Sequence, residues 1–423
     1  MNLVVTLDFR FVRTPDGQVW TRTTYPYSFW ERYLKVFERV QVVARAEMKE
    51  SVDEHYRAVM GPGVQFHAVP YYLGAWQYLK VRRRVQKFLR TVIAPEAAVL
   101  CRVGSRLAED FLPLLWKSGR PYGLEVVGDP YEAFAPRAIK HPLRPYLRRH
   151  ATRALKEQCA RAAAVSYVTQ QALQRRYPCG SKFAVGVSDT DLQPDWFSSL
   201  PRGFVTSDCI TELRAEDCTW GPKQFTSASR PRLLFVGSLE QMYKGQDILL
   251  RAVAQVQKKI PVELRIVGAG RHRQELESLA ESLSLGDSVH FTGELSSGAA
   301  IQSELDGATL MVLPSRTEGL PRVIVEAMAR ALPCIASNVG GIPELLDAED
   351  LVPPGDADAL ATKIEEVLRS PSRLNRMSVR NLAKAQQFRP EVLEKRRTEF
   401  YRFLRDTTET WLHSQSSGEI KIA

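Results

Sequence analysis

Short apolar runs recur along the first 190 residues, and amphipathic stretches lie between several of them. The runs are rich in Val, Ala and Leu and have the length of buried strands. Strands that alternate with helices predict a parallel, doubly wound α/β sheet. The predicted strands are Leu3–Leu7, Val40–Ala44, Val64–Ala68, Ala97–Arg102, Gly123–Val127, Ala164–Val168 and Lys182–Val187.

The same pattern resumes at Arg232, after a stretch that lacks it. Residues 191–230 are poor in apolar periodicity and rich in Ser, Asp, Pro and Gly, as interdomain connections are. The expected organisation is therefore an αβ domain over 1–190, a connection over 191–230, a second αβ domain over 231–389 and a C-terminal helical segment over 390–423, with its helix from Pro390 to Trp411.

Two segments of the first domain carry candidate binding chemistry. Residues 8–17 follow the first strand and read as a polar loop with a turn at its tip, and such loops form ligand crevices. The aromatic helix that opens near Tyr25 is interpreted as core, with substrate stacking as the alternative.

Composition limits the class of protein. The chain has 423 residues, 44% hydrophobic and 25% charged, which predicts a soluble protein of two or three domains. No run approaches the ~20 apolar residues of a membrane span, and residues 1–8 read as a first strand rather than a signal peptide. Six scattered cysteines favour reduced thiols in a cytoplasmic protein, without a zinc site.

The positive charge is concentrated in the first half of the chain. Residues 1–200 carry 30 Lys and Arg against 18 Asp and Glu, so we expect an anionic partner. Trp76–Arg90 has the pattern of a basic amphipathic helix, which either docks on an anionic membrane or packs on the sheet with its charges solvated. A second basic segment spans 140–153. Nucleic acid is not expected, because no nucleic-acid-binding motif accompanies the charge.

The strongest chemical signal lies between Ser315 and Ala329. An apolar run, Ala308–Leu313, is followed by Gly319, Pro321 and a helical pattern. We expect Pro321 in the first turn of that helix, where its missing N–H costs nothing. Strand, glycine turn and helix start place free N–H groups and the positive end of a helix dipole at one point, where an anion binds.

Two glutamates flank this predicted anion site. Glu318 lies in the loop and Glu326 in the second turn of the helix. Carboxylates accept hydrogen bonds from sugar hydroxyls, so the site suits a ligand with both phosphate and sugar. The alternative is an ordinary αβ unit with solvated glutamates.

This motif resembles the retaining glycosyltransferases of the GT-B fold, family 4, also called glycosyl transferases group 1. The resemblance rests on Glu318 and Glu326, eight positions apart, within Ser-Arg-Thr-Glu-Gly-Leu-Pro and followed by residues 333–345. It is specific over 231–390 and looser over 1–190. It implies two Rossmann-like domains that face each other across a cleft, the first for the acceptor and the second for the donor, and a C-terminal helix that returns to the first domain.

The resemblance also implies roles for individual residues. Lys244, followed by glycine, would contact the donor diphosphate, Glu318 the transferred sugar and Glu326 the ribose diol. Glu318 and Lys244 are the expected catalytic residues. The expected donor-binding set is Gly237, Ser238, Lys244, Gly268, Gly270, Thr292, Glu318, Gly319, Leu320, Pro321 and Glu326.

The chain departs from the family pattern at two positions. Ser238 stands where the family has an arginine that contacts the diphosphate, so Lys244 alone or another cation must act there; the candidates are Arg316, Arg322 and Arg271. The family histidine near Gly128 is absent. Asp129 is the nearest polar candidate on the acceptor side, and turn formation is its alternative role.

The implied reaction moves a sugar from a nucleotide-sugar to a hydroxyl of a glycan or lipid-linked acceptor, with retention. Neither a metal nor pyridoxal phosphate is expected, and residues 189–191 are interpreted as a solvated turn rather than a metal site. We expect a role in cell-surface polysaccharide or glycolipid assembly, in the cytoplasm or peripherally at the inner face of the plasma membrane. The alternatives are a catalytically inactive GT-B protein that binds a nucleotide-sugar or glycan, and a GT-B epimerase or phosphorylase.

Overall fold

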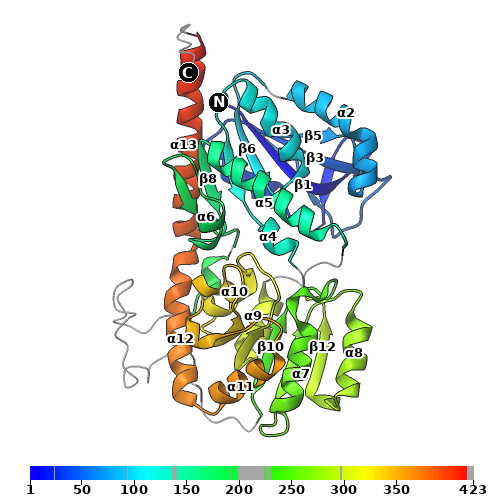
Figure 1. Ribbon diagram of the computed structural model, residues 1–423, viewed down its shortest axis with the longest axis vertical. Helices are drawn as coiled ribbons and strands as arrows, with labels where there is room; N and C mark the ends of the chain where they lie inside the picture. The colour runs from blue at the N-terminus through cyan, green and yellow to red at the C-terminus, as the bar shows by residue number, and fades with distance from the viewer. Residues whose placement is uncertain are drawn as a thin grey trace. The chain divides into compact units, whose positions relative to one another are not determined.

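The computed structural model describes residues 1–22, 24–92, 94–135, 141–190, 192–198, 223, 225, 230–295 and 298–416 (Figure 1). These form two compact units. The first comprises Met1–Tyr131, Pro145–Val187 and Glu394–Ala423, and the second comprises Glu132–Arg144 and Ser188–Leu393. Most of the predicted connection over 191–230, with Cys209 and Cys218, lies outside the described residues.

The first unit is built on a mainly parallel sheet with β1 at its centre. The seven parallel strands run in the order β5 (Val64–Val69), β3 (Val40–Met48), β1 (Leu3–Arg13), β6 (Ala98–Val103), β7 (Gly123–Val126), β8 (Ala164–Tyr167) and β9 (Ala184–Gly186). All seven strands predicted from the sequence are confirmed. The helices of the first unit include α1 (Tyr27–Leu34), α2 (Gly74–Val92), α3 (Arg106–Lys117), α5 (Arg144–Arg161) and α6 (Ala172–Arg176), and the short α4 (Pro130–Ala133) follows β7.

The polar loop predicted for residues 8–17 is wrong over most of its length. After an irregularity between Thr6 and Arg10, β1 continues beside β3 to Arg13. Asp8 and Arg10 are exposed, Phe9 is partly buried and Phe11 is buried, and such polar–apolar alternation is typical of a strand. Only the turn at the tip is confirmed, and it leads into the antiparallel strands β2 (Val19–Thr21) and β4 (Arg57–Ala58).

Helix α13 (Pro390–Ser416) returns to the first unit. Its Tyr401 is buried with Phe400, and the Tyr401 hydroxyl donates to Glu125 Oε1 at 2.9 Å. Tyr33 of α1 donates to Glu125 Oε2 at 3.1 Å, and Arg102 forms an ion pair with the same carboxylate. Helix α13 is therefore anchored by hydrogen bonding to the buried Glu125, whose charge Arg102 neutralises. The aromatic helix α1 contributes Trp30 and Tyr33 to the core, as predicted.

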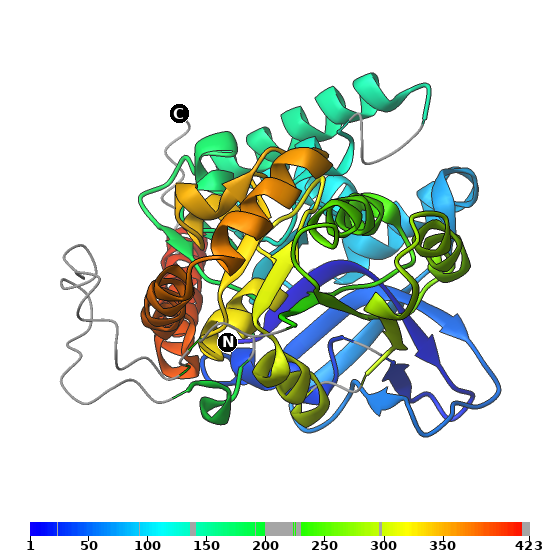
Figure 2. The ribbon, with the colours of Figure 1, turned by 90° about the horizontal axis from the view of Figure 1, so that it is seen from below.

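The second unit contains a six-stranded parallel sheet. Its order is β12 (Val289–Gly293), β11 (Glu263–Val267), β10 (Arg232–Val236), β13 (Leu310–Leu313), β14 (Cys334–Ser337) and β15 (Leu351–Val352). Helices lie on both faces of this sheet (Figure 2). They are α7 (Gln246–Val256), α8 (Arg273–Ser282), α9 (Ala299–Gly307), α10 (Arg322–Ala329), α11 (Ala357–Leu368) and α12 (Pro371–Ala385).

The strand order of the second sheet reverses between β10 and β13, which are direct neighbours. In doubly wound sheets, ligands bind beyond the carboxyl ends of the strands at this reversal. The loops that leave β10 and β13 contain Lys244 and Glu318. Two parallel α/β sheets and a long C-terminal helix confirm the predicted fold class.

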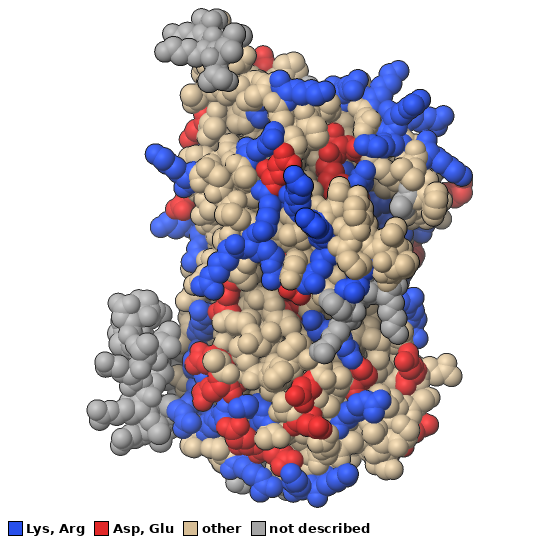
Figure 3. Space-filling view, viewed as in Figure 1, with Lys and Arg blue, Asp and Glu red and all other residues tan. Residues whose placement is uncertain are grey.

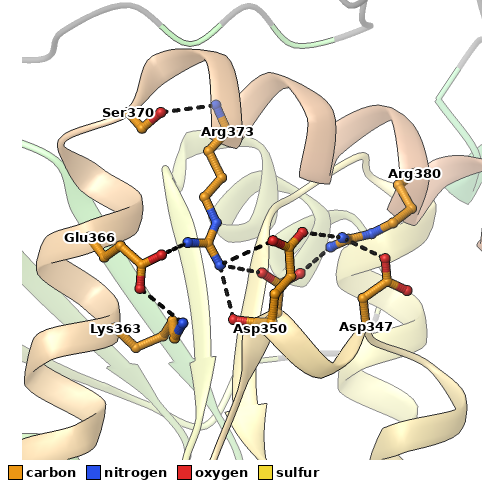
Figure 4. A network of polar contacts seen from close by, with 8 residues as sticks. Asp347, Asp350, Lys363, Glu366, Ser370, Arg373 and Arg380 are labelled. Carbon is orange, nitrogen blue, oxygen red and sulfur yellow. Dashed lines mark hydrogen bonds and ion pairs between the residues drawn. The ribbon is translucent and has the colours of Figure 1, made fainter. Parts of the chain in front are cut away.

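A buried charge network fastens α12 to the sheet of the second unit (Figure 4). Asp350, in the turn before β15, has no exposed side-chain surface. Arg373 donates to its Oδ1 at 3.1 Å, and Arg380 forms an ion pair with its Oδ2. Arg373 also pairs with Glu366 of α11. Because a buried carboxylate is costly without counter-charges, Asp350 holds Arg373 and Arg380 of α12 in place.

Candidate active site

Lys244 and Glu318 meet at the reversal of strand order. Lys244 Nζ donates to Glu318 Oε1 at 2.7 Å, although the two residues are 74 positions apart. The Ser315 hydroxyl, which is fully buried, donates to the same oxygen at 2.7 Å. Only 15% of the lysine side chain and 8% of the glutamate side chain are exposed. Two hydrogen bonds and burial thus hold the pair in a fixed position.

Gly245 makes this meeting possible. Its φ is +75°, and a Cβ built there would lie 2.0 Å from the carbonyl oxygen of Pro314. Only glycine tolerates both the left-handed backbone and the close approach to the end of β13. On the other side of the contact, Arg316 pairs with Asp247 through two bonds of 2.9 and 2.6 Å. The lysine turn and the glutamate loop therefore form one interlocked element.

The loop that follows β14 packs against the backbone of Glu318 and Gly319. The Gly341 N–H donates to the Gly319 carbonyl at 2.6 Å, and a Cβ on Gly340 would lie 2.0 Å from the Glu318 carbonyl oxygen. A Cβ on Gly319, in contrast, would meet no described atom within 4 Å. The fold therefore requires glycine at 340, whereas the space beside Gly319 is open.

Helix α10 starts at Arg322, so Pro321 is its N-cap residue rather than part of the first turn. The first-turn assignment from the sequence was one position early, because Pro321 has an extended ψ of 113°. Among the described residues no side chain caps this helix. The first N–H groups of α10 are consequently available to an anion beside Gly319.

Glu326 lies one turn into α10 and is largely buried. Its nearest cation is Arg322, whose Nη2 is 3.9 Å from Oε1 and whose side chain is 58% exposed. Burial raises the pKa of Glu326, and Arg322 offsets part of this effect. A carboxylate that is buried without a close partner has free acceptor capacity, which a ligand with hydroxyl groups would use.

The predicted glycines at the other strand ends have a structural reason of their own. Gly268 has φ +145°, and its Cβ would lie 2.0 Å from the Gly237 carbonyl oxygen. Gly270 has φ +157°, and its Cβ would lie 2.1 Å from the Glu240 nitrogen. Thr292, near the end of β12, donates to the Ile266 carbonyl at 3.3 Å. These residues bring the ends of β10, β11 and β12 into backbone contact.

Ser238 stabilises the turn after β10. Its hydroxyl accepts from the Glu240 N–H at 3.2 Å, and Gln246 Nε2 donates to its carbonyl at 2.9 Å. Of the three candidate replacement cations, Arg316 is neutralised by Asp247. Arg271 is 67% exposed, and its Nε donates to the Glu240 carbonyl at 3.0 Å; its ion pair with the Glu240 carboxylate is longer, at 3.7 Å, and solvent-exposed. Arg271 therefore carries an exposed positive charge to the segment that follows Ser238.

Asp129 in the first unit has the contacts of a structural residue. Its Oδ1 accepts from the Tyr177 hydroxyl at 2.6 Å and from the Tyr131 N–H at 3.0 Å. Arg176 forms an ion pair with the other oxygen, and only 6% of the side chain is exposed. These contacts match the turn-forming alternative.

The solvated turn predicted for residues 189–191 is wrong at Thr190, which is 1% exposed. Its hydroxyl lies 2.7 Å from the buried Ser188 hydroxyl, and the Thr190 N–H donates to that serine at 3.1 Å. Mutual hydrogen bonding makes this burial possible. Asp191 lies outside the described residues. Within the described ranges, no three His, Cys, Asp or Glu side chains group as metal ligands would.

Three supporting residues of the site escaped the sequence analysis. They are Ser315, Asp247 and Gly340. Ser315 opens the motif that contains Glu318, Gly340 lies in the 333–345 segment and Asp247 lies three positions after Lys244, and these positions are the only signal in the sequence. Asp247 and Gly340 contact Arg316 and Glu318, which follow a different strand, so the sequence alone does not assign them; Ser315 bonds Glu318 within the same loop.

The glycines at 319 and 340 allow a direct stability test. We expect Gly340→Ala to destabilise the protein by at least about 2 kcal/mol, because alanine is strained at φ +56° and collides with the Glu318 backbone. Gly319→Ala, the matched control, should change stability by less than about 1 kcal/mol. Urea unfolding measures both, and equal losses would contradict this assignment.

Residues 230–370 match the family model described as glycosyl transferases group 1. Protein CapJ of Staphylococcus aureus is 24% identical over 377 residues, which cover 88% of this chain and 87% of CapJ. Sucrose-phosphate synthase from Thermosynechococcus elongatus superposes with a TM-score of 0.68 at 17% identity, over 96% of this chain and 100% of that chain.

Other curated relatives match over a shorter part of their length. A GDP-mannose-dependent monoacylated alpha-(1-6)-phosphatidylinositol monomannoside mannosyltransferase of Corynebacterium glutamicum is 33% identical over 219 residues. The match covers 49% of this chain and 54% of that enzyme, so the chain spans about half of its length. The family match over the second unit and the shared two-sheet fold agree with the geometry of the site. Residues 230–370 therefore match the glycosyl transferases group 1, and the chain has the GT-B fold of glycosyltransferases.

Proposed function

We propose that this protein transfers a sugar from a nucleotide-sugar to a hydroxyl of a glycan or lipid-linked acceptor, with retention of the anomeric configuration. One observation carries the proposal. The fixed Lys244–Glu318 pair lies at the reversal of strand order, beside the open space at Gly319 and the uncapped start of α10. A cation, a carboxylate and free N–H groups at one point suit a ligand that combines diphosphate and sugar.

The donor diphosphate would bind between Lys244 and the first N–H groups of α10. Lys244 is already neutralised by Glu318, so an arriving diphosphate needs further positive charge. The helix dipole supplies part of it. We assign another part of this positive charge to the exposed Arg271, which contacts the segment after Ser238. Arg271 would replace the arginine that the family has at the position of Ser238. Arg316 is unsuited to this role, because Asp247 holds it in a two-bond pair.

The two glutamates would hold the two sugars of the donor. Glu318 accepts bonds from Lys244 and Ser315 on one oxygen, which fixes its orientation toward the transferred sugar. Glu326, buried with only a distant arginine, would accept from the ribose diol. Gly237, Gly268, Gly270 and Thr292 would shape the nucleoside end through their backbone.

The chemical step is the departure of the nucleoside diphosphate. Negative charge builds on the leaving phosphate, and preorganised donors lower the barrier because they need no reorganisation. We assign this stabilisation to Lys244 and to the N–H groups at Gly319 and Leu320. We propose that this reaction needs no metal ion. Initial rates that a chelator leaves unchanged would support this proposal, whereas activity that is lost with the chelator and restored by a divalent cation would contradict it.

The relatives support the proposed acceptor class. The Corynebacterium enzyme, by its name, acts on a phosphatidylinositol mannoside and uses GDP-mannose. An acceptor at a membrane surface would suit the positive charge of the first half of this chain. We therefore propose a role in cell-surface polysaccharide or glycolipid assembly.

A thermal-shift screen against UDP-, GDP- and ADP-sugars tests the donor site. A ligand that binds only the folded protein raises the melting temperature, by the equivalent of about 2.7 kcal/mol at a hundredfold excess over Kd. We expect one nucleotide series to stabilise the protein, and Arg271→Ala to reduce that shift. No shift with any nucleotide would refute the proposal.

The catalytically inactive alternative is kept because Ser238 replaces a charged group. It predicts the same thermal shift without turnover. Release of nucleoside diphosphate in the presence of donor and acceptor would exclude it.

Glu326 gives nucleotide binding a specific pH dependence. Its folded pKa is raised by burial, so it becomes protonated at a higher pH than an ordinary glutamate and then accepts ribose hydroxyls poorly. Affinity for the nucleoside diphosphate should therefore fall as pH decreases. The fall should begin at a pH above about 4.3, the usual pKa of a glutamate. Isothermal titration across pH measures this fall.

Glu326→Gln is the matched variant, because it keeps the titration of the ligand phosphates and removes that of the side chain. It should bind more weakly at pH 8 and show a shallower pH dependence. A folded pKa above the unfolded value also means that ionised Glu326 destabilises the ligand-free protein at neutral pH. Glu326→Gln should thus melt no lower than the wild type, and identical pH profiles would remove Glu326 from the site.

A further inference from the structure

Helix α2 of the first unit presents a solvent face of unusual composition. Residues 74–92 contain six Lys and Arg and no Asp or Glu. Figure 3 shows Lys and Arg gathered over the part of the molecule that Figure 1 labels α2. In the described part of the chain, no helix is both long and apolar enough to pass through a bilayer.

The apolar stripe noted in the sequence faces inward. Tyr78, Val85 and Leu89 are buried, and α2 packs against α3 and β5. The Tyr78 hydroxyl bonds Asp110 of α3, and Gln86 Nε2 donates to the same carboxylate at 3.0 Å. The packing alternative is thus correct for this stripe, which is not available for insertion into a membrane.

The opposite face begins with exposed apolar side chains. Trp76 is 81% exposed, Leu79 58% and Leu73 41%. This tip is not a frayed end, because Gly74 turns the chain at φ +65° and the Leu73 N–H donates to Gln77 Oε1 at 2.7 Å. An ordered tryptophan with most of its surface in water forgoes the free energy of apolar burial, which a partner would recover.

A line of cations continues from Trp76 along the helix. Steps of three and four residues place side chains on one face of an α-helix, and a series of basic residues at such steps follows Trp76, namely Lys80, Arg83, Lys87 and Arg90. We call the combined surface the docking face, and it consists of Leu73, Trp76, Leu79, Lys80, Arg83, Lys87 and Arg90.

We propose that the docking face binds the surface of an anionic bilayer, with Trp76 and Leu79 in the headgroup region and the four basic residues over the lipid charges. Charge complementarity selects this partner, since the face carries no acid and ends in a tryptophan–leucine tip of the kind found at membrane interfaces. The four basic residues reach acidic headgroups from their exposed positions. The face belongs to the first unit and the donor site to the second, so this inference does not depend on the transfer reaction.

Vesicle flotation of the full chain tests the proposal. We expect binding to vesicles of phosphatidylcholine mixed with phosphatidylglycerol, weak binding to phosphatidylcholine alone, and loss of binding at high salt. Each basic residue near an anionic surface contributes roughly fivefold in affinity, so reversal of Lys80, Arg83 and Lys87 to Glu should weaken binding on the order of 100-fold. Trp76→Ser should weaken it about tenfold.

Matched controls separate this face from net charge and from general hydrophobicity. Arg251, Lys258 and Arg369 are exposed in the second unit, and their reversal to Glu changes the net charge equally. Met48, 62% exposed at the end of β3, is the control for Trp76. Both controls should retain near-wild-type binding, and all variants should keep the melting temperature and the nucleotide-induced shift.

Three outcomes would overturn the proposal. The first is equal binding to neutral and anionic vesicles at low salt. The second is an equal loss of binding in the two triple variants, which would indicate a net-charge effect. The third is a dimer in sedimentation that Trp76→Ser dissociates, without any vesicle binding, which would identify a second copy of the chain as the occupant.

Discussion

Lys244→Ala is expected to lower kcat on the order of 10²- to 10³-fold, with a smaller change in the KM for the donor. Loss of one preorganised donor to a developing negative charge has an effect of this size. The lysine is largely buried, and its Nζ is already oriented by Glu318 at 2.7 Å. Its interaction with the leaving phosphate should therefore strengthen mainly in the transition state, which is the condition for an effect on kcat.

Steady-state kinetics of the purified variant measure this change. Lys259→Ala is the matched control, because Lys259 also pairs with a glutamate, Glu365 at 3.0 Å, but is 61% exposed and outside the site. Its kcat should stay within about twofold of the wild type, as expected for an exposed ion pair. Unchanged kinetics in Lys244→Ala would remove the lysine from the proposed mechanism, while nucleotide-induced thermal shifts would report separately on the donor site.

Asp350→Ala is expected to destabilise the protein by about 3–5 kcal/mol, the cost of removing one partner from a buried ion pair. The change leaves Arg373 without its buried carboxylate acceptor at 3.1 Å and removes the buried partner of Arg380, which keeps, within the described residues, only its contacts with the exposed Asp347 and Glu349. Both arginines lie on α12, so its attachment to the sheet should weaken (Figure 4). Urea unfolding monitored by circular dichroism measures the loss.

Glu366→Ala is the control within the same network. Glu366 pairs with Arg373 but its side chain is 51% exposed, so its removal should cost less than about 1 kcal/mol. Equal destabilisation by the two variants would show that the burial of Asp350 is not what gives the network its strength.

The sequence determined the fold class through the spacing of apolar runs. Parallel strands that are buried on both faces have to be nearly continuous runs of Val, Leu and Ala, and all seven strands predicted in the first unit are present. The same reasoning failed at residues 8–13, where β1 continues. Asp8 and Arg10 alternate with Phe9 and Phe11 there. The two charged residues favour the prediction of a polar loop, but alternation of polar and apolar residues is typical of a strand with one exposed face.

The sequence also indicated the candidate residues of the second unit: the strand, glycine turn and helix start predicted an anion site, and the resemblance to the glycosyltransferases implied the other donor-binding residues. It did not determine which of them touch. The pairing of Lys244 with Glu318, the role of Gly340 beneath it and the neutralisation of Arg316 by Asp247 depend on β10 and β13 becoming neighbours. Likewise, the pattern of α2 showed an amphipathic helix, but only the packing of Tyr78, Val85 and Leu89 decided which face is left for a partner. Local patterns fix the conformation of a segment, whereas contacts between distant segments arise from the topology of the sheet, which no single stretch of sequence contains.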